Sequence, residues 1–255
     1  MKAPERKLVI KPLRSKPKLP EDFETSSWDR LEEAVRAVQG TRPVSCSLEE
    51  LYHAVENLCV HNLAPKVYPQ LQELCDQHAK SMIDQLASRS SLDALPFLEH
   101  VGRTWDQYCS QLLLIRQIFL YLDRTYVLAT SNTRSIFDMG LQLFHTHLSA
   151  HPDVERKLVD GLLGMIEAER NGEAVDRMLL KDLLRMLSSL SMYADAFQWP
   201  FLERSKRYFA EEGVRLIQVT TITFFALLYL HAHTHTCTHI IPPPPNNSIP
   251  KNNRN

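Results

Sequence analysis

Apolar side chains recur every three or four positions through most of this chain, the spacing that places them on one face of an α-helix. The first such stretch runs from Trp28 to about Gly40, and Ser26 stands just before it in the pattern of an N-cap. The same spacing predicts further helices over residues 47–60, 65–86, 93–128, 135–148, 154–168, 176–190 and 194–218. No strand pattern separates them, so the predicted fold class is all-α.

Two of these helices have clear signals in their first turn. Ser47-Leu48-Glu49-Glu50 forms a capping box, in which the Ser47 hydroxyl accepts from the Glu50 amide and the Glu50 side chain can reach back. Pro65 suits the first turn of the next helix, where a missing N–H costs little. Because each amphipathic helix must bury its apolar face on a neighbour and the links are short, we predict an α-solenoid of antiparallel helices.

Composition supports this fold class and limits the function. Apolar residues make up 44% of the chain and only 7 glycines occur, which favours helix over turn-rich β structure. Residues 1–18 carry seven Lys or Arg against one acidic residue, whereas residues 19–218 carry 20 basic and 29 acidic residues. Nucleic-acid binding requires a basic surface, so we do not expect the acidic body to bind nucleic acid directly.

The two ends of the chain lack the helical pattern. Residues 1–27 are basic and punctuated by proline, which predicts a flexible N-terminal arm. Residues 219–255 are predicted to form an irregular tail, whose apolar run of about a dozen residues is short of the roughly 20 that span a membrane. His and Thr then largely alternate from His231, a pattern that either binds metal or, as we prefer, results from translation of a dinucleotide repeat.

The five cysteines are odd in number, widely spaced and without a CxxC motif. Most of them lie at apolar helix positions, which favours reduced core residues over a disulfide framework or a zinc site. The N-terminus lacks the continuous apolar segment of a secretory signal, because Leu8-Val9-Ile10 is only three residues long. We therefore expect the protein in the cytoplasm and nucleus.

No arrangement of residues in the helical body predicts catalysis. The body has no phosphate-binding glycine loop, nucleophile elbow or paired carboxylates in a plausible cleft. His147 and His151 could share a helix face, but a third ligand is missing, so neither a metal site nor a cofactor is predicted. Leu48 and Phe137 are more informative, because each stands near a helix start beside acidic neighbours and could anchor a protein partner.

Four segments resemble the N-terminal region of the cullin family in sequence and in order. They are residues 48–59, 121–128, 136–141 and 166–173. The N-terminal arm, with Lys7-Leu8-Val9-Ile10-Lys11 followed by Lys16-Pro17-Lys18-Leu19-Pro20, is similar to the extension of the cullin-4 subfamily. The resemblance is expected to stop near Gln218.

The resemblance implies a stack of cullin repeats, each a five-helix unit, with a first repeat over residues 28–150 and a partial second repeat over residues 151–218. It implies a non-catalytic scaffold of a RING-type ubiquitin ligase whose first repeat binds an adaptor. In the cullin-4 subfamily this adaptor is the damaged-DNA-binding protein, a triple β-propeller. By position, the adaptor-binding residues are Leu8, Val9 and Ile10 of the arm, Leu48, Glu49 and Tyr52 of the second helix, and Phe137, Asp138 and Met139 of the fifth.

Three features depart from the subfamily pattern. Phe137 stands where cullin-4 proteins usually have tryptophan, which keeps an aromatic anchor but removes the indole N–H. Trp199-Pro200 lies inside the predicted helix 194–218 and is expected to kink it. The chain also ends before the remaining repeats, the cullin-homology region and the RING-docking site, so we expect it to bind the adaptor without binding a RING protein.

Two other classes of function fit the pattern. One is a helical-repeat interaction module outside the ubiquitin system, which would not depend on Leu48 and Phe137. The other is a membrane-tethered helical protein, which would require insertion of the apolar run at residues 219–230.

Overall fold

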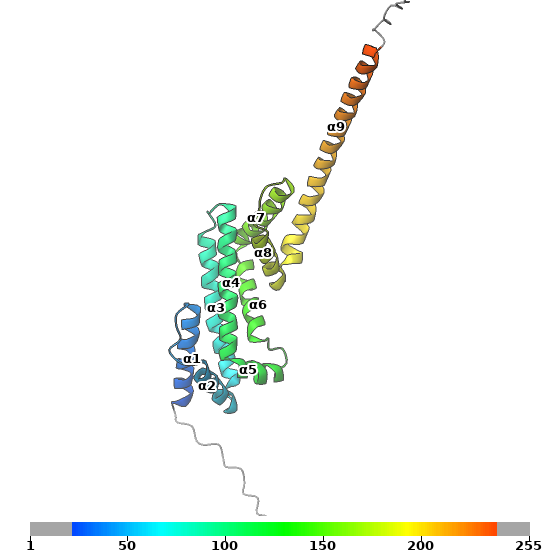
Figure 1. The fold of residues 1–255 in the computed structure, drawn as a ribbon. Coiled ribbons are helices and arrows are strands. Elements are labelled where there is room, and N and C mark those ends of the chain that lie inside the picture. The colour runs from blue at the N-terminus through cyan, green and yellow to red at the C-terminus, as the bar shows by residue number, and fades with distance from the viewer. Residues whose placement is uncertain (1–21, 239–255) are drawn as a thin grey trace, which may run out of the picture. The chain divides into compact units, whose positions relative to one another are not determined.

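The computed structural model of the chain describes residues 22–238, with side chains described as far as Leu228. Within this range every regular element is helical, so the all-α fold class is confirmed (Figure 1). The elements are α1 (Phe23–Gln39), α2 (Leu48–Val60), α3 (Ala64–Ser88), α4 (Ala94–Ile118), α5 (Leu120–Leu122), the π-helical turn η1 (Asp123–Val127), α6 (Ile136–Ser149), α7 (Pro152–Arg170), α8 (Arg177–Ser189), the π-helical turn η2 (Tyr193–Gln198) and α9 (Trp199–Thr238).

The described chain divides after Phe197 into two compact units. In the first unit α4 is the central helix, and it packs against α1, α2, α3, α6, α7 and α8. Helix α3 packs along α6, and α2 packs against α1 and α5. Figure 1 shows α1, α2 and α5 at one end of the long α3 and α4 pair, with α7 and α8 toward the other end. The second unit contains α9.

Helices α4 and α6 approach each other closely at Gly140. A Cβ added to this glycine would lie 2.5 Å from the Leu112 methyl carbons, and Leu112 itself is buried. The Tyr108 hydroxyl donates a 2.8 Å hydrogen bond to the Gly140 carbonyl oxygen. The absence of a side chain at Gly140 therefore allows α6 to approach α4 closely, which fixes the position of α6 in the unit.

Most of the predicted helix starts are confirmed, and three of them, at α2, α6 and α8, have a side-chain cap. The Ser47 hydroxyl accepts from the Glu50 amide at 3.2 Å, and the Ser135 hydroxyl accepts from the Asp138 amide at 3.1 Å. Asp176 caps α8 by accepting from the amides of Met178 and Leu179. In each case one side chain satisfies amides that the first helical turn leaves without a backbone partner.

The predicted cap at Ser26 is wrong. Helix α1 begins at Phe23, and the Ser26 amide already donates to the Asp22 carbonyl oxygen at 2.9 Å. A residue that makes this backbone bond is inside the helix, so its hydroxyl has no free amide to cap. The helical pattern therefore extends into the segment that was predicted to be a flexible arm.

The single helix predicted over residues 93–128 is also wrong. Helix α4 ends at Ile118, where Phe119 adopts φ −94° and ψ 21° with its side chain fully buried. A short helix and the π-turn η1 follow, and Val127 at the end of this turn is buried. Side-chain burial in the tertiary structure thus outweighs the continuous apolar pattern of the sequence.

The irregular structure predicted from residue 219 is wrong as far as the structure describes the tail. Helix α9 continues without a break from Trp199 to Thr238. Pro200 is its second residue rather than an interior kink, because the preceding turn η2 ends at Gln198. Proline is well tolerated in a first turn, where its missing N–H has no helical partner.

Candidate docking surface

The start of α2 presents an exposed leucine on a fixed backbone. Leu48 is the first residue of α2 and its side chain is 49% exposed. Ser47 caps the helix, and Glu49 and Glu50 in the first turn place negative charge at the positive end of the helix dipole. The cap and the dipole both stabilise this turn, so Leu48 is held outward with acidic side chains beside it.

Tyr52 connects this turn to the next element at the same end of the unit. Its ring is half-buried and meets the edge of the Tyr121 ring, with the ring centroids 6.2 Å apart and the planes at 81°. Tyr121 belongs to α5, which packs against α2. The edge-to-face contact therefore couples the exposed start of α2 to the segment that leads into η1.

The start of α6 has a similar construction. Ser135 caps the helix by accepting from the Asp138 amide, and its hydroxyl also donates to Asp138 Oδ2 at 2.7 Å, so it bonds both the backbone and the side chain of Asp138. Phe137 is half-buried and Asp138 is exposed. Met139 is only 3% exposed and therefore supports this turn from the core. An aromatic ring and a carboxylate thus face outward at the first turn of α6.

A buried carboxylate fastens α6 to the preceding elements. Asp123 in η1 is 7% exposed, and its Oδ1 accepts from the Ile136 amide at 2.9 Å. Its Oδ2 accepts from Arg116 Nε of α4 at 3.1 Å. The Tyr68 hydroxyl of α3 donates to the Arg134 carbonyl oxygen at 2.9 Å. The segment between η1 and α6 is therefore held at both ends, a role that sequence analysis missed because the partners are distant in the chain.

Two hollows flank the first turns of α6. The first has a volume of about 210 Å³ and is lined by Tyr68, Arg134, Met139 and Gln142, among others. The second has a volume of about 230 Å³ and includes Arg134, Asp138, Gln142 and residues 189–191. Each has room for a single side chain of a partner rather than for a cofactor, which suits a protein-binding surface.

Of the nine residues predicted to bind a partner, Leu8, Val9 and Ile10 lie outside the described part of the chain. The other six lie at the starts of α2 and α6, which α5, η1 and the Asp123 hydrogen bond connect. Five of the six are exposed or half-buried: Leu48, Glu49, Tyr52, Phe137 and Asp138. Met139 is buried.

One histidine and two cysteines of the described residues have structural surroundings. His147 Nε2 lies 2.8 Å from Asp76 Oδ1, a contact that joins α6 to α3. No group of three His, Cys, Asp or Glu residues in the described range could hold a metal ion. Burial raises the pKa of Cys75 to about 12 and that of Cys109 to about 12. Thiols with such pKa values are protonated and unreactive at neutral pH.

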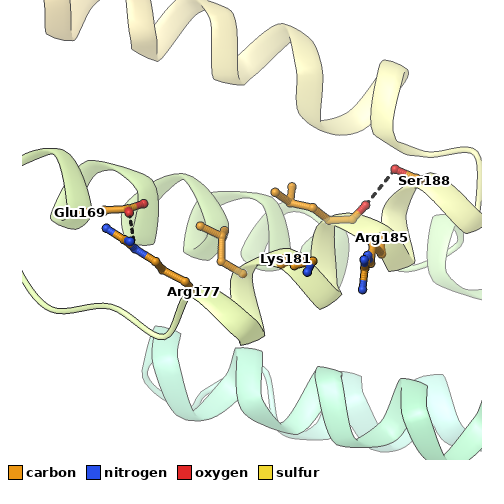
Figure 2. Close-up of a pocket in the computed structure, with 7 residues that line it drawn as sticks. Glu169, Arg177, Lys181, Arg185 and Ser188 are labelled. Carbon is orange, nitrogen blue, oxygen red and sulfur yellow. Dashed lines mark hydrogen bonds and ion pairs between the residues drawn. The ribbon is translucent and has the colours of Figure 1, made fainter.

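A larger groove of about 550 Å³ lies along α8 (Figure 2). Leu180 and Leu184 line it, and Arg177, Lys181 and Arg185 follow one another along the helix. Arg177 pairs with Glu169 at 2.7 Å and Arg185 pairs with Asp182 at 3.6 Å. Two of its three cations thus have carboxylate partners, which reduces the attraction of the groove for an anion.

The first turn of α8 lies at the other end of α4 from Asp123, although residues 189–191 at the end of α8 line the hollow beside Asp138. Leu179 in this turn packs near Gly102 at the beginning of α4, because a Cβ added to Gly102 would lie 3.2 Å from a Leu179 methyl carbon. Arg116, near the end of α4, donates a hydrogen bond to Asp123. These two positions are roughly 20 Å apart along the helix axis. Exposed residues in the first turn of α8 are therefore suitable controls for a docking surface at the other end of α4.

No helix in the described range is long and apolar enough to cross a lipid bilayer. Within the first unit the described chain is a set of successive helices packed on one another, which is the architecture of helical-repeat proteins. The family model described as the cullin alpha solenoid domain matches residues 28–234, so the match extends beyond Gln218. The chain belongs to the cullin family, and this region of a cullin is a non-catalytic scaffold.

Individual relatives support the same assignment. The chain is 48% identical over 213 residues to Cullin-4A of Homo sapiens, which covers 84% of this chain and 28% of the relative. It is 47% identical over 213 residues to Cullin-4A of Mus musculus, with the same coverage. It is 40% identical over 208 residues to Cullin-4 of Dictyostelium discoideum, covering 81% of this chain and 26% of that relative. The chain thus spans about 28% of the length of the first of these relatives.

Proposed function

We propose that this chain is an adaptor-binding region of a cullin-4-type scaffold in a RING ubiquitin ligase. Its adaptor is the damaged-DNA-binding protein, a triple β-propeller, as the resemblance to the cullin-4 subfamily implies. The proposal is best supported by the placement of Leu48 and Phe137 on capped helix starts that Tyr121 and Asp123 connect. Residues 28–150 form the docking repeat and residues 151–218 begin a second repeat.

The two helix starts have the properties of a binding hot spot. Leu48 and Phe137 supply apolar surface, and Glu49 and Asp138 place carboxylates next to them. Because both turns are capped, little conformational entropy is lost when a partner covers them. The complementary surface on the adaptor consists of apolar pockets rimmed by hydrogen-bond donors or basic side chains.

Binding of the full chain to the purified adaptor tests the proposal. Wild type is expected to bind at micromolar concentration or tighter, and Leu48→Ala combined with Phe137→Ala is expected to weaken binding at least tenfold. Met178→Ala is the matched control. Like Phe137, Met178 is the second residue of a capped helix, but it lies on α8, and it is 63% exposed. Absence of binding by wild type at micromolar concentrations contradicts the proposal, and equal binding by the double variant favours a different interaction module.

Competition follows from the same surface. A separate polypeptide of these 255 residues occupies the adaptor without bringing the rest of a ligase to it. Added to a reconstituted cullin-4 ligase, it is expected to reduce substrate ubiquitination in proportion to the adaptor it binds. The Leu48→Ala, Phe137→Ala chain is expected not to inhibit at the same concentration, which separates competition for the adaptor from nonspecific inhibition.

A further inference from the structure

Helix α9 exposes apolar side chains along the whole length over which its side chains are described. Twelve large apolar side chains between Trp199 and Leu228 are 48–70% exposed. Single exposed apolar residues are ordinary, but a soluble protein rarely leaves so many of them in one continuous patch unless a partner covers it. The question is therefore which partner matches the area and the charge of this helix.

Five of these side chains form one apolar stripe along α9. They are Leu202, Phe209, Leu216, Val219 and Leu227. The first three recur at intervals of seven residues, and the other two follow Leu216 by three and eleven residues, so all five share one face of the helix. At 1.5 Å per residue the stripe is about 38 Å long. A seven-residue apolar repeat is the spacing by which two helices pack side by side.

The charges along α9 suit a second copy of the same helix in antiparallel orientation. Residues 203–215 contain four basic and three acidic residues, whereas residues 216–228 contain none. Glu212 lies on the face of the stripe and pairs with Arg215 of its own helix. A parallel pair would place two Glu212 carboxylates opposite each other, whereas an antiparallel pair centred on Leu216 places each one against the uncharged half of the other copy.

The exposed apolar area of α9 is sufficient for a pair. Twelve side chains that each expose roughly 100 Å² supply about 1,200 Å² per chain. A helix that lies along the stripe covers about half of this area on each chain, so a pair buries about 1,200 Å² in total. This is the lower end of the range for specific protein interfaces, which indicates a dimer of moderate affinity.

A lipid surface fits α9 less well than a second copy does. A helix that lies in the plane of a membrane has one apolar face and one strongly polar face. In α9, Ile222 and Phe225 lie away from the stripe and are 68% and 64% exposed. The second half of the helix therefore lacks the polar face that an in-plane helix turns toward water.

We propose that the apolar stripe pairs two copies of this chain through antiparallel α9 helices. Adaptor binding is not required for this pairing, because α9 belongs to the second unit and the docking residues belong to the first. Each dimer then carries two copies of the docking repeat. The proposed function and the pairing can consequently fail separately.

Sedimentation equilibrium of the full chain tests the pairing. Wild type is expected to form a dimer with a Kd on the order of 10 µM, and Leu216→Asp combined with Leu227→Asp is expected to raise this Kd at least tenfold. Ile222→Asp combined with Phe225→Asp is the matched control, because it adds the same charge at exposed apolar residues of the same helix. This control is expected to dimerise as wild type. Circular dichroism checks that both variants keep their helix content, and Leu216→Ala with Leu227→Ala repeats the test without added charge.

Three results would overturn the pairing. The first is a wild-type chain that stays monomeric at about 100 µM. The second is an equal loss of dimer in the stripe variant and the matched control. The third is a monomer that sediments with vesicles of phosphatidylcholine and phosphatidylserine, which would identify lipid as the occupant. The orientation has its own test: Glu212→Gln is expected to leave the Kd unchanged, and a tighter dimer would overturn the antiparallel arrangement.

Discussion

Asp123 Oδ1 accepts a hydrogen bond of 2.9 Å from the Ile136 amide, across thirteen residues of chain. This amide belongs to the first turn of α6, where backbone donors have no helical partner. The same carboxylate binds Arg116 of α4 through its other oxygen. Asp123 thus determines where α6 starts relative to α4, and so where Phe137 is presented.

Substitution of Asp123 is expected to weaken both folding and docking. Asp123→Ala leaves the Ile136 amide without its acceptor in a buried site, which costs about 1–3 kcal/mol of unfolding free energy. Urea denaturation measures this cost, and adaptor titration at a temperature where the variant is folded is expected to show weaker binding. Asp138→Ala, at an exposed residue of the same turn, is expected to destabilise less. A variant at Asp123 with wild-type stability would contradict the role assigned to this carboxylate.

The close crossing of α4 and α6 makes a second prediction about stability. Gly140→Ala places a methyl group 2.5 Å from buried Leu112 carbons, so overpacking is expected to cost about 1–3 kcal/mol. Gly164→Ala on α7 is the matched control, because a Cβ there meets nothing within 4 Å. It is expected to stabilise the helix by up to about 1 kcal/mol. A lower thermal unfolding midpoint for Gly140→Ala together with a higher one for Gly164→Ala would verify the close approach of α4 and α6 at Gly140. Shifts of both midpoints in the same direction would contradict it.

Sequence patterns identified the parts of the surface that local chemistry determines. The starts of α2 and α6 were predictable because Ser47 and Ser135 bond amides three residues away. The Asp123 hydrogen bond was not predictable, because it depends on how η1 folds back toward α6. Met139 appeared as a docking residue by position alone, and its burial depends on tertiary packing that periodicity does not resolve.

Stability is expected to fall at acidic pH because of His78. Burial lowers the pKa of this imidazole below its ordinary value of 6.5, and a hydrogen bond with Gln111 partly opposes the shift. Because the unfolded state then binds more protons than the folded state, stability is full above pH 6.5 and declines as the pH falls through 6.5 toward the folded pKa. The variant His78→Gln is expected to show a shallower decline in urea titrations between pH 7 and pH 5. Burial also lowers the pKa of His100, so part of the decline is expected to remain.

Thiol reactivity is expected to follow burial. Cys75 is 1% exposed, and burial raises its pKa to about 12, whereas Cys46 is half-exposed. Iodoacetamide at pH 8 is therefore expected to modify Cys46 well before Cys75, as peptide mass mapping can follow. Addition of urea is expected to remove the difference, since unfolding exposes both thiols. Equal rates for the folded protein would contradict the burial of Cys75.

The aromatic anchor at the start of α6 is expected to tolerate a larger ring. Phe137 is half-buried, so part of its ring faces solvent and leaves space for an indole. Because tryptophan adds apolar area and an N–H donor, Phe137→Trp is expected to strengthen adaptor binding about threefold to tenfold. Titration of the full chain measures the change, and Met178→Trp at the start of α8 controls for a general increase in apolar surface. Weaker binding by Phe137→Trp alone would mean that the adaptor pocket matches a phenyl ring. A similar gain for both variants would show that the added area acts without a specific pocket.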